Sequence, residues 1–164
     1  MNGFGEEDDF CKKYDAINDI TYVSDYSDNA PILVKGKWRK VNQNNTQIQI
    51  SHCPGIENEL GTILELMIWE YDKEGWLGKS NENILIESFN KQSAFWDKIT
   101  VKYEIIKSDK VASYSIYKVF EFEERRIELW GVKNKKHYRI AIYNFDPNQY
   151  ISIEDFLIGI FTIN

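Results

Sequence analysis

The residues that could do chemistry are few. His52 and Cys53 are adjacent, and His137 is the only other histidine of the 164-residue chain. A thiol and an imidazole within hydrogen-bond reach form the nucleophile and base of a covalent mechanism. Neighbouring residues of a strand point to opposite faces, however, so His52 is badly placed to serve Cys53. A Cys–His site would need His137 near Cys53, and we favour a structural strand end at this pair.

The second cysteine, Cys11, lies far from Cys53 in the sequence, and no Cys-x-x-Cys pattern is present. This spacing gives neither a zinc set nor a disulfide framework, and no further metal ligand follows His52 at helical or turn spacing. A single disulfide between Cys11 and Cys53 is an alternative, but two reduced thiols in a cytoplasmic protein are the simpler interpretation. We therefore predict no metal, no cofactor and a cytoplasmic location.

The segment DPNQYIS at residues 146–152 has side-chain oxygens at alternate positions, as a calcium loop does. Ile151 stands where an EF-hand needs glycine, and Leu157 stands where it needs glutamate. A turn that leads into a capped helix is therefore the better interpretation. Phosphate-binding glycine loops and the motifs of serine hydrolases and zinc proteases are also absent from the sequence. We predict that the protein is not an enzyme.

Acidic residues dominate the charge, with a formal net charge of −6 and an acidic run at residues 6–9. Because no basic stripe is present, we predict no nucleic-acid partner. No apolar run has the length of a membrane span, so we predict no membrane association either. The mixed run EFEERRIE at residues 121–128 is interpreted as a solvated hairpin face. Its functional alternative is an acidic patch for a basic protein.

Residues 111–145, which include the run at residues 121–128 and His137, are predicted to form an antiparallel meander. Apolar and polar residues alternate with period two over three segments rich in β-branched and aromatic residues, which is typical of half-buried strands. The breaks at residues 123–125 and 133–136 are short and charged, as hairpin connections are. Further strands are predicted at residues 20–23, 31–41, 46–51, 63–71 and 100–107. The run at residues 63–71 is ambiguous by composition, and the absence of a 3.6-residue period favours a strand.

Two helices should flank the strands. The first begins at Ser80 or Asn81, continues to about Lys98 and carries an apolar stripe. The second begins after Ser152, an N-cap with Asp155 three residues later, and we expect its apolar face to pack on the sheet. The stripe of the first helix is Leu85, Phe89, Phe95, Trp96 and Ile99. The apolar face of the second helix is Ile153, Phe156, Leu157, Ile160 and Phe161, with Ile151 and Phe156 as a hydrophobic staple.

The chain is long enough for one domain with a full core and short for two. Residues 1–30 are predicted to be an N-terminal extension made of a short helix and a loop. The helix is suggested by Phe10, Tyr14 and Ile17, which are spaced by four and three residues. Residues 31–164 are predicted to form a single α+β domain.

This order of elements resembles the PsbP-like α/β/α sandwich. The resemblance covers residues 31–164 and includes the segment GKWRKV at residues 36–41 and the tail EDFLIGIFTI at residues 154–163. It implies an antiparallel sheet with a C-terminal meander, flanked by helices. The family is chiefly a binding and assembly fold, and it supplies no catalytic residues to carry over.

Aromatic residues make up 15% of the chain, and Tyr and Trp are enriched at interfaces. We therefore predict a non-enzymatic protein-binding module, one form of which is a bacterial immunity-type protein that masks a toxin. The alternatives are a subunit of a larger assembly and a small-ligand-binding or enzymatic domain, whose pocket between sheet and helices would use Trp69, Trp76 or Trp130. For a protein partner, Glu123 and Glu124 would steer association, and Tyr117 and Trp130 would be the anchors. The competing interpretation of the two rings is that both belong to the core.

Overall fold

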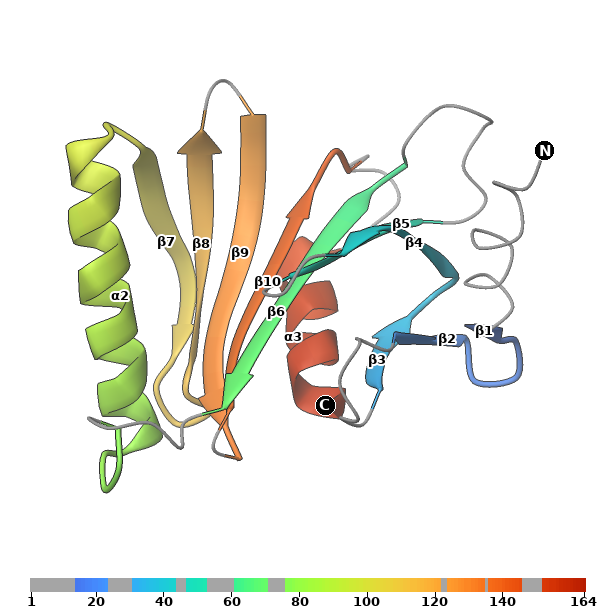
Figure 1. Cartoon of the computed structure of the whole chain (residues 1–164), viewed down its shortest axis with the longest axis horizontal. Helices are drawn as coiled ribbons and strands as arrows, with labels where there is room; N and C mark the ends of the chain where they lie inside the picture. Colours follow the sequence, from blue (N-terminus) through green and yellow to red (C-terminus); the bar gives the residue numbers. More distant parts are fainter. Residues whose placement is uncertain are drawn as a thin grey trace. The chain divides into compact units, whose positions relative to one another are not determined.

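The computed structural model describes residues 14–23, 31–43, 47–52, 61–70, 76–121, 124–134, 136–145 and 152–164. The chain divides into two compact units (Figure 1): residues 1–65 with 144–164 form the first, and residues 66–143 form the second. Strand β6 (Ile63–Glu70) begins in the first unit and ends in the second. No helix among the described residues is long and apolar enough to cross a membrane.

The first unit contains a three-stranded antiparallel sheet in the order β1-β2-β3. Its strands are β1 (Tyr14–Asp15), β2 (Ile20–Val23) and β3 (Ile32–Lys35). The predicted helix is wrong where it is described, because the Asp15 carboxylate accepts the N–H groups of Ile17 and Asn18 and closes a turn instead. Phe10 lies outside the described residues. The pairing of β2 with β3 joins strands on either side of the boundary expected after residue 30.

Strands β4 (Trp38–Gln43) and β5 (Ile48–His52) pair in antiparallel fashion, and the beginning of β6 follows β5 in the sheet order. The single strand predicted at residues 31–41 is in fact two strands, β3 and β4. Gly36 separates them with a φ of +97°, a conformation that L side chains rarely adopt. The chain therefore turns beside Trp38.

Helix α3 (Ile153–Ile163) completes the first unit, and its N-cap is Ser152 as predicted. The Ser152 hydroxyl accepts the N–H of Asp155 at 3.2 Å. The helix lies beside β3 (Figure 1). The predicted apolar face is confirmed, although Phe156 is only half-buried and the staple partner Ile151 lies outside the described residues. The fully buried members are Ile153, Leu157, Ile160 and Phe161.

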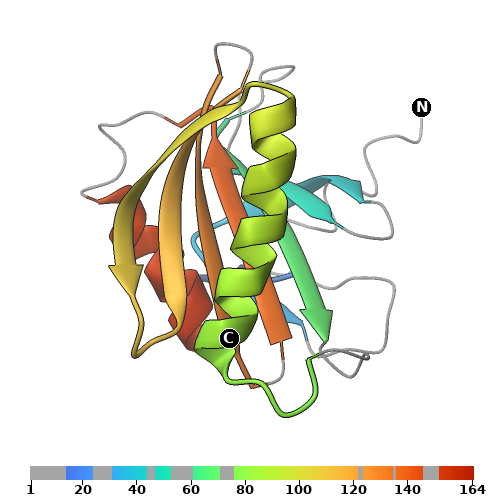
Figure 2. The same ribbon diagram turned by 90° about the vertical axis from the view of Figure 1, so that its left-hand side faces the viewer.

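The second unit confirms the predicted meander. Its strands follow the order β6-β10-β9-β8-β7, and the pairs β7–β8, β8–β9 and β9–β10 are antiparallel. Helix α2 (Asn81–Lys98) begins after Ser80, one of the two predicted caps, and lies along one face of this sheet (Figure 2). The strands are β7 (Lys102–Asp109), β8 (Tyr114–Glu121), β9 (Glu124–Lys133) and β10 (Lys136–Tyr143).

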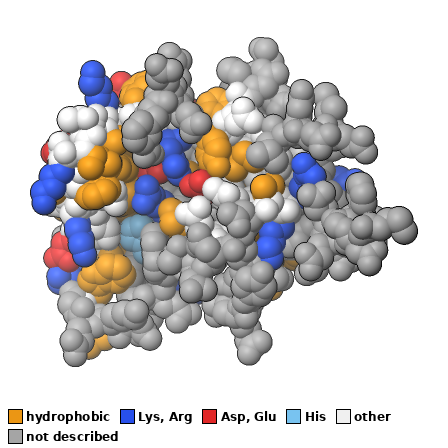
Figure 3. Space-filling view, turned by 45° about the horizontal axis from the view of Figure 1, so that its top comes forward, with side chains coloured by type: hydrophobic (Ala, Val, Ile, Leu, Met, Phe, Trp, Pro, Cys, Tyr) orange, Lys and Arg blue, Asp and Glu red, His pale blue; other side chains and the backbone are white. Residues whose placement is uncertain are grey.

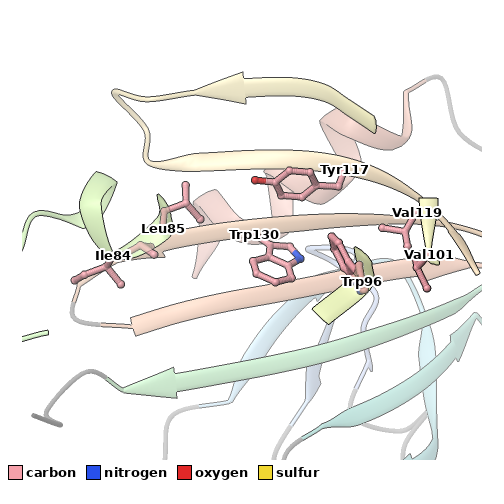
Figure 4. Packing of buried hydrophobic residues seen from close by; sticks show 8 residues of the cluster. Ile84, Leu85, Trp96, Val101, Tyr117, Val119 and Trp130 are labelled. Atoms are coloured by element: carbon pink, nitrogen blue, oxygen red, sulfur yellow. The ribbon is translucent and has the colours of Figure 1, made fainter. Parts of the chain in front are cut away.

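An aromatic core fills the space between α2 and the sheet of the second unit (Figure 4). The rings of Phe89 and Tyr117 are stacked, with centroids 4.7 Å apart. The predicted helix stripe is wrong at its C-terminal end, since Phe95 is 54% and Ile99 is 45% exposed. Both rows of side chains on β8 are buried at its centre, so alternation alone could not show which row α2 covers. The buried cluster consists of Ile84, Leu85, Trp96, Val101, Tyr117, Val119, Trp130 and Val132.

Candidate functional site

The anchors proposed from the sequence are core residues. Tyr117 and Trp130 are each 3% exposed and belong to the cluster under α2, so neither is a surface anchor. Their position agrees with the competing interpretation that both rings are core. Glu123 lies outside the described residues, and Glu124 is described only as part of the β9 backbone. The steering role of these two acids stays a prediction.

The residues of the Cys–His hypothesis are only partly described. His52 ends β5, whereas Cys53 and Cys11 lie outside the described residues. His137 is buried in β10, and its ring lies edge-on to Trp130 at 5.8 Å. Burial, with Arg139 nearby, lowers the pKa of His137 to about 4, so its imidazole is neutral near pH 7. In the described part of the chain, no three His, Cys, Asp or Glu side chains gather as metal ligands would.

One acid of the run at residues 121–128 is not solvated. Glu128 is 1% exposed, which corrects the prediction of a solvated face at this position. Arg139 Nη2 donates to Glu128 Oε1 at 2.9 Å, and Arg126 Nε lies 3.1 Å from the same oxygen. Trp130 Nε1 donates to Oε2 at 2.9 Å. Since a buried carboxylate is costly unless it is paired, this network holds the strand face together and orients Trp130.

A pocket of about 690 Å³ lies in the first unit, at a place that sequence reasoning missed. The sequence-based alternative expected a pocket around Trp69, Trp76 or Trp130. Trp130 is core, Trp76 packs against the same core, and the Trp69 side chain is not described. The pocket observed is built instead on Trp38 and α3. It is lined by Asp19, Lys35, Gly36, Trp38, His52, Ser152, Asp155, Phe156, Gly159, Ile160 and Ile163.

Trp38 forms the floor of this pocket. Trp38 has no exposed surface. Its backbone N–H donates to Thr21 Oγ1 at 3.1 Å, and its indole Nε1 donates to the Lys35 carbonyl at 2.8 Å. Phe156 stacks on it with a centroid distance of 6.1 Å. His52 meets it edge-on at 5.1 Å. Trp38 therefore supports the half-buried Phe156 and His52 from beneath, and these two rings are what a ligand would touch.

Gly36 shapes the pocket beside this floor. A side-chain carbon at this position would lie 3.1 Å from Trp38 Nε1 and 3.9 Å from His52 Nε2. The Gly36 N–H donates to the carbonyl of Asp19 at 2.7 Å. Tyr14 donates its hydroxyl to Asp19 Oδ1 at 2.6 Å. Both bonds fix the turn between β1 and β2, so the exposed Asp19 carboxylate has a defined place at the rim.

Gly159 leaves the helical wall of the pocket bare. It lies inside α3 and is exposed, and a Cβ at this position would meet no atom of the described residues within 4 Å. Glycine inside a helix costs about 1 kcal/mol relative to alanine, and here no close packing requires it. Ile163, one turn further along the helix, is 46% exposed at the same pocket. A ligand can therefore lie directly against the helix backbone, next to an apolar side chain.

The electrostatics of the pocket are mixed. Asp19 and Asp155 contribute carboxylates, and Lys35 contributes an ammonium group. Burial lowers the pKa of His52 below its usual value, while the negative charge of Asp19 acts in the opposite direction. The imidazole is consequently neutral near pH 7. Within the described residues, its nitrogens take part in no hydrogen bond.

Asp19, His52 and Ser152 are residue types that could form a nucleophilic triad, and all three line the pocket. The Ser152 hydroxyl is used otherwise, because it donates to Glu154 Oε2 at 3.0 Å and accepts the N–H of Asp155. A serine that caps a helix in this way is not activated by the imidazole.

Comparison with known proteins shows the fold. No protein-family model matches the chain, and no curated protein sequence matches it. The solution structure of cyanobacterial PsbP (CyanoP) from Synechocystis sp. PCC 6803 superposes with a TM-score of 0.53 at 12% sequence identity. The match covers 88% of this chain and 91% of that one. The chain therefore has the PsbP-like α+β fold, as the resemblance of its element order implied.

Proposed function

We propose that the protein is a non-enzymatic binding module that receives a segment of a partner protein in the pocket beside α3. The observation that carries this proposal is the bare wall at Gly159. An exposed glycine inside an 11-residue helix lowers the stability of that helix, and no neighbour among the described residues explains it. A pocket that must admit a ligand against the helix backbone does explain it.

The dimensions of the pocket support the same proposal. Ligand pockets typically measure about 300–1,000 Å³ and combine apolar walls with a few polar groups. The pocket of about 690 Å³ lies within this range and has Phe156 and Ile163 beside His52 and two carboxylates. On the face drawn in Figure 3, hydrophobic side chains are interspersed with Lys and Arg.

A toxin is one partner that would fit this proposal, and the protein would then be an immunity-type protein that masks it. The net charge of −6 supports a basic partner, since complementary charge accelerates association. A small molecule of similar chemistry would occupy the same pocket. Substitutions at Gly159 separate these two occupants.

Two substitutions at Gly159 test the pocket. Alanine and methionine both favour helix, so both should raise the stability of α3 by a similar amount, but only methionine reaches into the pocket. Tagged wild-type protein and both variants are used to capture partners from a lysate of the native cell. We expect one protein to be retained by wild type, to be retained less by Gly159→Ala, whose methyl group covers part of the helix backbone, and to be lost with Gly159→Met.

Retention of that protein by Gly159→Met would place its binding surface elsewhere and overturn the proposal. If a small molecule co-purifies with wild type and Gly159→Ala, and no protein depends on the pocket, the alternative of a small-ligand-binding domain replaces it. Thermal unfolding of all three proteins provides the control, because both variants must remain folded.

A further inference from the structure

We infer that the pocket receives a cationic side chain, arginine or lysine, from its partner. This inference rests on the proposed function and adds the chemistry of the anchor. It is carried by the arrangement of the carboxylates around an apolar wall. Asp19 enters the pocket from the turn between β1 and β2, and Asp155 enters it from the first turn of α3.

Asp19 is prepared to accept a hydrogen bond from a ligand. The Tyr14 hydroxyl holds its Oδ1 at 2.6 Å, and the backbone of Asp19 is held by Gly36. Among the described residues, no group donates to Asp19 Oδ2. A fixed carboxylate with an oxygen available is the usual receptor for a guanidinium or ammonium group, because hydrogen bonds between charged partners are short and strong.

The wall beneath suits the stem of such a side chain. Lysine and arginine lay their methylene groups along apolar surface and keep the charge in water. The bare backbone at Gly159 and the exposed Ile163 offer that surface. The half-buried ring of Phe156 lies at the same place, and a cation over an aromatic face is additionally attracted to it.

An anionic anchor fits this pocket poorly, even though a helix N-terminus lies at it. The dipole of α3 would favour an anion. Ser152 already accepts the N–H of Asp155 with its hydroxyl and that of Phe156 with its carbonyl. Glu154 and Asp155 already place negative charge at the first turn. An incoming anion would therefore meet carboxylates, and among the described lining residues Lys35 and a neutral His52 would be left to offset them.

The test uses three capped peptides, acetyl-Leu-X-Leu-amide, in which X is arginine, its neutral isostere citrulline, or glutamate. Binding to the full chain is followed through backbone amide chemical shifts at Gly36, His52 and Gly159. We expect the arginine peptide to shift these amides and to bind about tenfold or more tightly than the citrulline peptide, as loss of a charge-assisted hydrogen bond predicts. The glutamate peptide should bind most weakly.

Two variants identify the cause of the preference. Asp19→Asn keeps the shape of the side chain and tolerates the positive φ of 54° at this position, so the turn should be retained. It should remove most of the difference between arginine and citrulline. Asn90→Ala, at an exposed position of α2 that does not line the pocket, should leave that difference intact, and Gly159→Met should abolish binding of every peptide at these amides.

Equal affinities for the arginine and citrulline peptides at wild type would overturn the cationic anchor. So would an arginine preference that survives unchanged in Asp19→Asn. Either result leaves the proposed function standing if partner capture still depends on Gly159. Conversely, a partner that is retained by Gly159→Met removes the proposed function itself, so the two failures are distinguishable.

Discussion

Asn164 pairs with Leu33 as a neighbouring strand would. Its side-chain amide accepts the Leu33 N–H at 2.9 Å and donates to the Leu33 carbonyl at 2.8 Å. The same amide donates to the carbonyl of Ile160 at 2.9 Å. One side chain thus satisfies the backbone of β3 and the last turn of α3, and ties the helix that forms the pocket wall to the sheet.

Asn164→Ala should therefore lower the free energy of unfolding by about 1–3 kcal/mol, because it leaves partly buried backbone groups of Leu33 without their partner. Urea unfolding measures the loss. Asn90→Ala, at an exposed position of α2, is the control and should cause no loss. Equal behaviour of the two variants would show that the bonds to Leu33 contribute nothing to stability.

Glu128→Ala should lower the free energy of unfolding by about 3–5 kcal/mol, since Arg126 and Arg139 would lose the buried carboxylate that compensates their charge. The control is Glu104→Ala, because Glu104 lies 3.8 Å from Lys118 and is 57% exposed. An exposed pair of this kind contributes about 0–1 kcal/mol. A loss at Glu128 as small as the loss at Glu104 would contradict the structural role of the network.

Leu157→Ala should cost about 2–5 kcal/mol, because the side chain is fully buried in the first unit. The sequence places Phe156 on the same apolar helix face as Leu157, but the structure makes Phe156 half-buried and part of the pocket. We now expect Phe156→Ala to cost less than Leu157→Ala in urea unfolding and to weaken partner binding more. The reverse order in both measurements would remove Phe156 from the binding surface.

Acid should destabilise the protein through His137. The pKa of this residue is about 4 in the folded chain, below its ordinary value of 6.5. A depressed pKa means that the unfolded chain binds the proton more readily than the folded chain. The contribution of His137 to the free energy of unfolding is therefore fully present above pH 6.5 and is lost as the pH drops towards 4. In His137→Gln the slope of unfolding free energy against pH should be smaller over this range. An unchanged slope would assign the acid sensitivity to other groups.

Much of the fold follows from local patterns. The meander and α3 were predictable because alternation and the Ser152 cap are properties of neighbouring residues. The burial of Glu128 was not predictable in the same way, since its arginine partner Arg139 comes from another strand. The sequence pattern that placed Ile99 on the buried stripe of α2 could not show where the sheet beneath the helix ends.

The pocket was hidden for a related reason. Gly36 and Trp38 are close in sequence, but Gly159 and His52 join them only through the fold. An isolated glycine within the apolar helical pattern of α3 was the one signal available, because it lowers helix propensity without an evident benefit. The role of Gly159 can be inferred only once the pocket beside it is known.

Gly36 limits how binding specificity can change among related chains. The same residue permits the turn from β3 to β4 and keeps space open next to Trp38 and His52. Any replacement would strain the turn and narrow the pocket together, so selection cannot adjust one without the other. Lys35 and Asp155 are exposed at the same pocket, and their side chains do not hold this turn. Evolutionary change in ligand preference should therefore accumulate at these rim positions, while the floor stays constant.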